Sequence, residues 1–579
     1  MRRGSTRRTV RGAIALGLVV ACVASCGGDD DAAEPETSAG PVAPTGAVDS
    51  EPVGTSTATT ERAPVETVGT VAVGQEGDSG GPTRTGWVRD IASDPSVNSR
   101  PADWNPDGEL RIGYGGPPRQ LDPAAELGLV YLRPIYDSLT ELGPDGQVRP
   151  RLATGWSYPD ATTMVLTLRE GVSFQDGTPF DAEAVRVNLE RYKTLPTSVQ
   201  ASSLSAIDTI EVIDDHTVQL NLSSGGAELP VMFSQGGGMM VSPKAIAETP
   251  DAIATEGAGA SGAYVLESFT AGESASYVPN PNFWDLRKGL LARLTIVGVT
   301  DTAQRINALE AGDLEMAQIF GAPVAEAQAQ LAAGELQGLA VDLDGLQYGM
   351  MLRDTLPPFD NPLVREAVAY AIDKEGFSQA LYDGACNPAA QFFPAGHWAH
   401  APELEGTYAY DPDRARELIA ESGVTDLKVT MRTIAVYTAA SEVFQAMLEA
   451  VGFDVTLEVV DRPTEFGEGT AHLTAMAVGN TYEASQLAAS YAVGAYHLVG
   501  DDVARMEELI SIGNDPAGSV ETWQPAFAEI WAALYGGFRI IPACNAQHVW
   551  AHDGSVANID DLLYTTSGSI DVSYLYVRA

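Results

Sequence analysis

The chain has 579 residues, of which 45% are hydrophobic, an ordinary proportion for a globular protein. This length exceeds what one hydrophobic core usually serves, so we expect several domains. Asp and Glu number 78 against 34 Lys and Arg, which gives a formal net charge of −44. Such an acidic chain is repelled by phosphate backbones, so the composition excludes nucleic acids as partners.

The first 25 residues have the composition of an export signal. Five arginines precede an apolar run from Ala13 to Val23. The run is too short to span a bilayer and ends in small residues, which predicts a signal peptide over residues 1–25 rather than a transmembrane anchor. The segment Thr6–Val10 loosely resembles a twin-arginine signal, and general secretion is the equal alternative.

The signal ends in Val23-Ala24-Ser25-Cys26, which resembles the lipobox of bacterial lipoproteins. The resemblance implies that Cys26 is lipidated and becomes the mature N-terminus; a plain signal peptide with an incidental Cys is the alternative. Residues 26–85 are rich in Pro, Thr, Ser, Gly, Ala and Glu, so we predict a disordered acidic tether after the lipid. The protein is then exported and held at the outer face of the cytoplasmic membrane.

Beyond residue 108 the apolar residues alternate between strand and helix spacing. Period-two alternation predicts strands over 110–114, 164–169, 217–222, 294–299, 428–433 and 454–459. Helical spacing predicts helices over 181–191, 302–311, 362–372, 412–421 and 439–451. Asp181 is the expected N-cap of the first helix. Interleaved strands and helices indicate an α/β fold.

Two cysteines, Cys386 and Cys544, accompany Cys26 in the mature chain. Cysteines often pair in the oxidising compartment that an export signal implies, so we predict a disulfide between these two. Two buried free thiols are the alternative. A catalytic thiol is the weakest interpretation, because nothing nearby marks a paired His.

A series of short segments, in order, resembles the family 5 solute-binding proteins, the oligopeptide, dipeptide and nickel-type receptors of ABC importers. The most specific is LREGVSFQDGTPF at 168–180. The accompanying segments are QLDP at 120–123, IYDSL at 135–139, PRLA at 150–153, GW at 155–156, GAY at 262–264, NPNFW at 280–284, RINALEAGD at 305–313, PFDNPLVREAV at 358–368, AIDK at 371–374 and YDP at 410–412. Most contain turn or helix-start signals, so we interpret them as scaffold rather than as ligand contacts.

The resemblance implies a two-lobed periplasmic-binding-protein fold with an extra small domain in the first lobe. The implied ranges are 108–140, 242–345 and 526–579 for lobe I, 141–241 for the extra domain, and 346–525 for lobe II. It also implies a monomer that encloses its solute by hinge closure and delivers it to an ABC permease and ATPase.

The resemblance further points to residues that line the cleft. Peptide-binding members pair an Asp of the second lobe with the α-amino group of the ligand, and the corresponding stretch here contains Asn480, Tyr482 and Glu483 but no Asp. Glu483 is the candidate replacement, one methylene longer. Tyr348 and Met350 lie on the strand expected to cross into lobe II.

An aromatic loop bracketed by Gly and Pro is a further candidate surface. Its candidate members for a stacking wall against the solute are Phe393 and Trp398. Phe392 precedes the first of these, and His397 precedes the second. The alternative is that these residues pack as a satellite core under a long loop.

The sequence contains no recognisable motif for catalysis or for a cofactor. A Gly-x-Ser-x-Gly elbow, a phosphate-binding Gly-x-x-x-x-Gly-Lys-Ser/Thr loop and a His-Glu-x-x-His helix are all missing. His397 and His400, like His548 and His552, have the spacing of a metal-binding pair, but neither pair has a third ligand in register. We therefore expect no metal and no cofactor.

Together these features predict an exported, lipid-anchored receptor that is not an enzyme. A peptide is the default solute, and the missing Asp keeps a sugar or a metal chelate as an alternative. A sensor or chaperone lipoprotein of the same fold, without a permease, is a second alternative. A secreted hydrolase is least favoured, because no motif sets a nucleophile beside a base.

Overall fold

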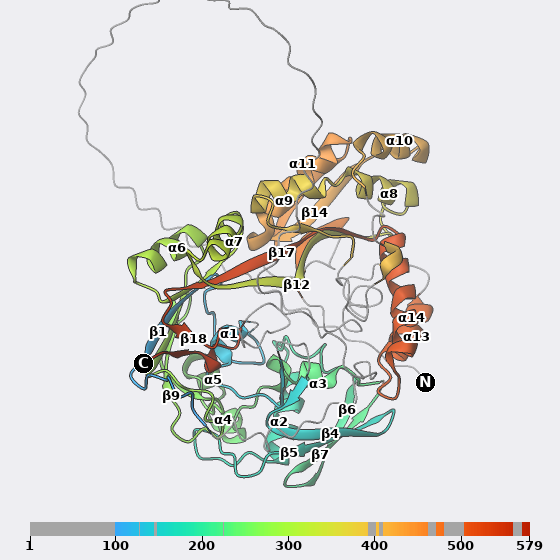
Figure 1. Ribbon diagram of the computed structural model, residues 1–579. Helices are drawn as coiled ribbons and strands as arrows, with labels where there is room; N and C mark the ends of the chain where they lie inside the picture. The colour runs from blue at the N-terminus through green and yellow to red at the C-terminus, as the bar shows by residue number, and fades with distance from the viewer. Residues whose placement is uncertain are drawn as a thin grey trace, which may run out of the picture. The chain divides into compact units, whose positions relative to one another are not determined.

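The computed structural model describes residues 99–126, 128–143, 148–223, 225–391, 401–404, 409–460, 471–479, 503–559 and 570–579 (Figure 1). Only the backbone is described for residues 342–346, 436, 476–479 and 520. All of these residues belong to the second of two units, residues 67–579. The predicted signal peptide and tether lie outside the described residues. Within the described ranges, no helix combines the length and apolar character that crossing a membrane requires.

An eleven-stranded mixed sheet is the largest element of the fold. Its strand order is β15-β14-β16-β12-β17-β11-β1-β10-β9-β8, and β13 pairs with β17 outside this path. The strands are β1 Glu109–Tyr114, β8 Tyr264–Thr270, β9 Ser274–Pro279, β10 Arg293–Gly298, β11 Met316–Ile319, β12 Gln337–Leu352, β13 Asn387–Pro388, β14 Lys428–Ile434, β15 Asp454–Val460, β16 Leu473–Gly479 and β17 Ile540–His552.

Smaller sheets complete the strands. A four-stranded antiparallel sheet has the order β4-β5-β7-β6, and two further pairs join β2 to β3 and β18 to β19. Their bounds are β2 Thr140–Leu142, β3 Val148–Pro150, β4 Ala153–Asp160, β5 Thr163–Leu168, β6 Ile207–Asp214, β7 Thr217–Leu222, β18 Val556–Ala557 and β19 Tyr576–Val577.

The described helices are mostly short. Their bounds are α1 Leu129–Leu132, α2 Ala182–Thr194, α3 Leu229–Met232, α4 Pro243–Glu248, α5 Pro250–Glu256, α6 Thr302–Ala311, α7 Pro323–Ala333, α8 Pro362–Ala371, α9 Lys374–Tyr382, α10 Pro412–Ser422, α11 Thr438–Ala450, α13 Val503–Gly513 and α14 Val520–Trp531. The 3-10 turns are η3 Gly236–Gly238, η4 Pro402–Leu404, η5 Ala435–Tyr437 and η9 Val572–Tyr574, and α14 continues as the π-helical turn η8 Ala532–Gly536.

Every helix and strand predicted by periodicity is confirmed, with end points that differ by a few residues. The local reasons are visible at the helix starts. The Asp181 carboxylate accepts a hydrogen bond from the Ala184 amide at 2.9 Å, as expected for the N-cap of α2. Asn361 caps α8 in the same way, and Pro362 occupies the first turn, where no amide donor is required.

The apolar side chains gather into three clusters. Cluster A packs around β1 and β9, with Ile112 and Tyr277 fully buried. Cluster B lies between the four-stranded sheet and α2, with Leu166 and Leu189 fully buried. Cluster C packs α8, α9, α11 and α14 against the other end of the large sheet, around Phe444. Separate clusters of this kind agree with the several cores that the chain length predicts.

The long antiparallel strands β12 and β17 join clusters A and C. Val341 of β12 belongs to cluster A, and Met350 of the same strand belongs to cluster C. The two strands run side by side, with register shifts between Asp342 and Gln347 and between Tyr348 and Gly349 (Figure 1). Two of the domain boundaries implied by the sequence fall inside an element. The boundary between residues 345 and 346 lies within β12, and the boundary between residues 525 and 526 lies within α14.

Candidate functional site

The first candidate region surrounds Tyr348 on β12, at the part of the strand that enters cluster C. The Tyr382 hydroxyl of α9 donates to the Tyr348 hydroxyl at 3.0 Å. The Tyr348 ring lies 5.9 Å from that of Tyr382, 6.0 Å from that of Tyr437 and 5.7 Å from that of Phe377. Burial raises the pKa of Tyr382 to about 12, so its hydroxyl stays protonated and remains a hydrogen-bond donor. These rings form an aromatic wall with polar tips.

Met350 lies two residues further along β12 but has a different environment. Its side chain has no exposed surface and belongs to cluster C, whereas Tyr348 is half-buried. A side chain without accessible surface cannot contact a solute in this conformation. The structure therefore gives Met350 a packing role and leaves Tyr348 as the candidate contact of the pair.

An amide group precedes Tyr348. The Gln347 side chain is only 1% exposed, and its Nε2 donates to the Gln391 carbonyl and to Asn545 Oδ1, the latter at 3.1 Å. Because both acceptors face Nε2, they fix the orientation of the Gln347 side-chain amide. Its Oε1 is buried and has no hydrogen-bond partner among the described residues. Unsatisfied buried acceptors are uncommon in proteins, because each costs its desolvation energy.

A disulfide joins the neighbouring strand to the loop after α9. Cys386 and Cys544 have sulfur atoms 1.96 Å apart and Cα atoms 5.6 Å apart. Cys544 lies opposite Tyr348 in the register of β12 and β17, and it also faces Pro388 of β13. The covalent link therefore fixes the loop that follows Tyr382, the last residue of α9, to the strand that pairs with Tyr348.

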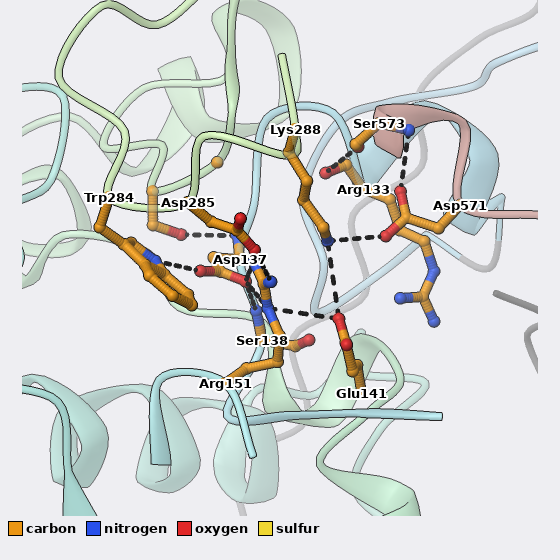
Figure 2. Close-up of polar contacts among 12 residues, drawn as sticks. Arg133, Asp137, Ser138, Glu141, Arg151, Trp284, Asp285, Lys288, Asp571 and Ser573 are labelled. Atoms are coloured by element: carbon orange, nitrogen blue, oxygen red, sulfur yellow. Dashed lines mark hydrogen bonds and ion pairs between the residues drawn. The ribbon is translucent and has the colours of Figure 1, made fainter. Parts of the chain in front are cut away.

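The second region is a buried ionic network where three distant chain segments meet (Figure 2). Its centre is Arg151, which has no exposed surface. Nε and Nη2 of Arg151 donate to Asp137 Oδ1 at 3.0 and 2.9 Å, and Nη1 donates to Asp285 Oδ2 at 2.8 Å. Nη1 also reaches the Tyr574 hydroxyl at 3.3 Å, and that hydroxyl donates to Glu141 at 2.9 Å. All three guanidinium nitrogens therefore have partners.

Further contacts extend this network. Trp284 Nε1 donates to Asp137 Oδ2 at 2.8 Å, and the Arg151 guanidinium lies 4.6 Å from the centre of the Trp284 ring (Figure 2). Lys288 Nζ lies 2.9 Å from Asp571 Oδ2 and 3.9 Å from Glu141 Oε2. Buried charges are tolerated when each charged group makes several hydrogen bonds to groups of opposite charge, as these residues do.

The pKa shifts report how well the charges are matched. Burial disfavours the charged form of Arg151, yet the attraction of the surrounding acidic groups raises the pKa of Arg151 well above its usual value. Burial likewise raises the pKa of Asp285, but the charge of Arg151 and the contacts with Arg287 outweigh it and bring that pKa down to about 2. Lys288 and Arg133 similarly hold the pKa of Asp571 below its usual value.

Several of these residues come from the segments that carry the family resemblance. Asp137 lies in IYDSL, Arg151 in PRLA and Trp284 in NPNFW. Their contacts with one another give them a structural role, in line with the scaffold interpretation. Asp285, the partner of Arg151 Nη1, directly follows NPNFW. Its position next to a motif is a signal by which sequence reasoning can find it. Tyr574 lies 423 residues from Arg151, and no sequence signal marks it.

The remaining predicted site residues are not described, and the two histidines that we did not predict as metal ligands have other partners. Phe393, Trp398, Asn480, Tyr482, Glu483 and the lipidation candidate Cys26 lie outside the described residues. His548 and His552 lie on a strand, β17, and not on a helix. His548 Nδ1 is 3.4 Å from Gln318 Nε2, and His552 Nδ1 accepts from the Gly554 amide. In the part of the chain that the structure describes, no three His, Cys, Asp or Glu residues group as metal ligands do.

A protein-family model matches a large part of the chain. The model for bacterial extracellular solute-binding proteins, family 5 Middle, matches residues 147–501, more than half of the sequence. The chain belongs to this family. The two-lobed α/β fold of periplasmic binding proteins is thereby confirmed as the fold class that the sequence predicts.

Known members of family 5 show how far the similarity extends. The glutathione-binding protein GsiB of Salmonella paratyphi A is 30% identical over 333 residues, which cover 56% of this chain and 64% of that protein. The match thus spans less than two thirds of the relative's length.

Two solved structures have the same fold. The binding protein AgaA of A. tumefaciens, in complex with agropinic acid, gives a TM-score of 0.72 at 22% identity and covers 82% of this chain and 99% of its own. DppA of Helicobacter pylori, in complex with the peptide STSA, gives 0.69 at 20% identity and covers 82% and 98%.

Proposed function

We propose that this family 5 protein is the exported receptor of an ABC importer, which captures a solute between two lobes and delivers it to a permease and ATPase. The observation that carries the proposal is the family match over residues 147–501. The two long strands β12 and β17, which join clusters A and C, support it as the connection between lobes. The receptor carries out no chemical step on its solute.

The proposed lobes follow the ranges implied by the sequence. Lobe I comprises 108–140, 242–345 and 526–579, the extra domain 141–241, and lobe II 346–525. Clusters A and C support a division into two bodies, and cluster B supports a separate small domain. Cluster C also includes Trp531 and Ile540 from the range given to lobe I, so the boundary at 525/526 does not follow the packing. Hinge closure about β12 and β17 would enclose the solute and remove it from water.

The proposed solute is a peptide or a peptide-like molecule. The relatives support this choice, because one is named for glutathione and another was solved with the peptide STSA. The aromatic wall at Tyr348 suits an apolar side chain or backbone. The complex of AgaA with agropinic acid keeps a non-peptide solute as the second candidate. A sensor or chaperone role without a permease is the third.

Intact mass spectrometry of the receptor purified from its host tests the solute directly. The protein is sprayed under native conditions and then denatured, and the mass that leaves is measured. A ladder of peptide masses is the expected result. A single non-peptide mass would replace the peptide by another solute class, and repeated absence of any bound mass would favour the sensor role.

The proposed anchor is a lipid on Cys26, followed by a tether over residues 26–85. The small residues before Cys26 support this assignment. Replacing Cys26 by Ser should move the protein from the membrane fraction to the medium or the periplasm. Unchanged membrane association of that variant would contradict the anchor without affecting the receptor proposal.

A further inference from the structure

A loop of the extra domain contacts a turn of lobe II. The loop is Gly225–Ala227, shortly before α3, and the turn is Asn514–Asp515, between α13 and α14. The Ala227 amide donates to the Asn514 carbonyl oxygen at 3.3 Å. In the proposed division the loop belongs to the range 141–241 and the turn to lobe II. The contact therefore joins two bodies without using the connecting strands β12 and β17.

The two backbones approach so closely that position 225 has no room for a side chain. A Cβ placed on Gly225 would lie 1.9 Å from the Asn514 carbonyl oxygen and 3.1 Å from the Asp515 amide nitrogen. The φ angle of Gly225 is not positive, so the backbone conformation alone would accept other residues. The steric fit against lobe II is what excludes them.

Each half of the contact is held by its own body. The Tyr158 hydroxyl, on β4 of the extra domain, donates to the Gly226 carbonyl oxygen at 2.6 Å. In lobe II, Trp523 Nε1 of α14 donates to the Asp515 carbonyl oxygen at 3.1 Å, and Trp523 is only 1% exposed. Because these supports lie within the separate bodies, neither half needs the other to keep its shape.

The chemistry of the contact favours reversible formation. The bond from Ala227 to Asn514 joins two backbone groups, and water can satisfy both of them when they separate. Asn514 Oδ1 is buried and has no hydrogen-bond partner among the described residues. A buried acceptor without a donor loses its hydration, and separation of the two halves would restore it.

The turn also lies at a distance from the strands that connect the lobes. Helix α14 has 12 residues, and a helix rises 1.5 Å per residue, so about 18 Å separates its start beside the turn from its other end. That other end leads through η8 to β17. A rotation of the lobes about β12 and β17 therefore displaces the turn and breaks the bond to Ala227.

We propose that Gly225–Ala227 and Asn514–Asp515 form a latch, which is open in the solute-free receptor and forms when the lobes close. This inference rests on the proposed receptor function and adds that the extra domain helps to hold the closed state. The latch stabilises only the closed state, so it raises the affinity for the solute without touching it. The alternative is a permanent contact, in which the extra domain and lobe II move as one body.

Thermal unfolding without solute distinguishes a latch from a permanent contact. The mature protein is dialysed free of solute, and Gly225→Ala is compared with the wild type. A latch predicts no loss of melting temperature, because the added methyl group overlaps nothing in the open state. Gly536→Ala is the matched control, because a Cβ there meets no atom within 4 Å and the loss of chain entropy is the same. A clear loss confined to Gly225→Ala would overturn the inference.

Calorimetric titration with trialanine and with glutathione measures the effect on affinity. We expect Gly225→Ala to bind at least about tenfold more weakly than the wild type, since the overlap with Asn514 penalises only the closed state. Gly536→Ala should match the wild type. Tyr158→Phe leaves Gly225 in place and removes only the hydroxyl that holds the loop, so it should weaken binding by about threefold.

The outcomes separate the latch from the receptor function. Equal affinities of Gly225→Ala and the wild type would overturn the latch and leave the receptor function standing. A wild type that binds neither probe would count against the proposed peptide-like solute, and the melting comparison would still decide between a latch and a permanent contact.

Discussion

Arg151 and Gln347 are both buried polar side chains, yet their surroundings differ. Each guanidinium nitrogen of Arg151 has an acidic partner, either Asp137 of the motif IYDSL or Asp285, which directly follows NPNFW. Gln347 has two acceptors for its Nε2, and among the described residues no donor reaches its Oε1. A fully satisfied network fixes a scaffold, whereas an unsatisfied group beside a half-buried aromatic wall is available for another partner. The difference distinguishes the scaffold around Arg151 from the region around Tyr348, which is the candidate for solute binding.

The largest expected effect comes from breaking the ionic network. Arg151→Met removes the cation that Asp137, Glu141 and Asp285 share, so we expect the free energy of unfolding to fall by about 3–5 kcal/mol. Urea denaturation measures the loss. Arg186→Gln, which removes exposed pairs with Glu183 and Glu190, is the matched control and should cost less than about 1 kcal/mol. Similar losses in both variants would contradict the central role of Arg151.

The disulfide tests the region around Tyr348 by itself. The double variant Cys386→Ala, Cys544→Ala should lose about 2–4 kcal/mol of stability, because the cross-link limits the unfolded chain over a separation of 158 residues. Reduction of the wild type should lower its stability by a similar amount. Thiol labelling of the unfolded, unreduced protein should leave both cysteines unmodified, and labelling of the two would disprove the bond.

Acid should titrate His548 of β17 and the carboxylates of the ionic network in different pH ranges. Burial lowers the pKa of His548 to about 4, so the stability from its neutral form is complete above pH 6.5 and is lost as pH falls toward 4. The loss is on the order of 3 kcal/mol. The carboxylate of Asp285, with a pKa of about 2, contributes above its unfolded pKa near 4 and loses that contribution between about 4 and 2.

A urea titration series across pH separates these steps. His548→Gln should remove the loss between pH 6.5 and 4 and leave the lower one. A His548→Gln profile that still falls by the same amount in the upper range would assign that step to another group.

The smallest effect is expected at the aromatic wall. Tyr382→Phe removes the hydroxyl that donates to Tyr348 and should cost about 1 kcal/mol, since the rings remain packed. Tyr410→Phe, at a side chain that is 51% exposed, is the control and should be neutral. If Tyr348 contacts the solute, Tyr382→Phe should also change the affinity for the solute. Tyr410→Phe should leave that affinity unchanged.

The sequence alone determined the local elements of this protein. Strand and helix spacing predicted β1, β5, β7, β10, β14 and β15 and helices α2, α6, α8, α10 and α11, because these patterns depend on near neighbours in the chain. The cap at Asp181 followed from the same local chemistry. The motif series was sufficient to indicate the family and its fold.

The tertiary structure decided which distant residues meet. Arg151 contacts Asp285 and Tyr574 across 134 and 423 residues, and no local rule selects those partners. It also decided that Met350 packs in the core while Tyr348, two residues earlier on the same strand, stays half-buried. It further decided which groups meet the buried acids. Lys288 reaches Asp571 and Tyr574 reaches Glu141 from segments far along the chain, because the balance of buried charge depends on the whole fold.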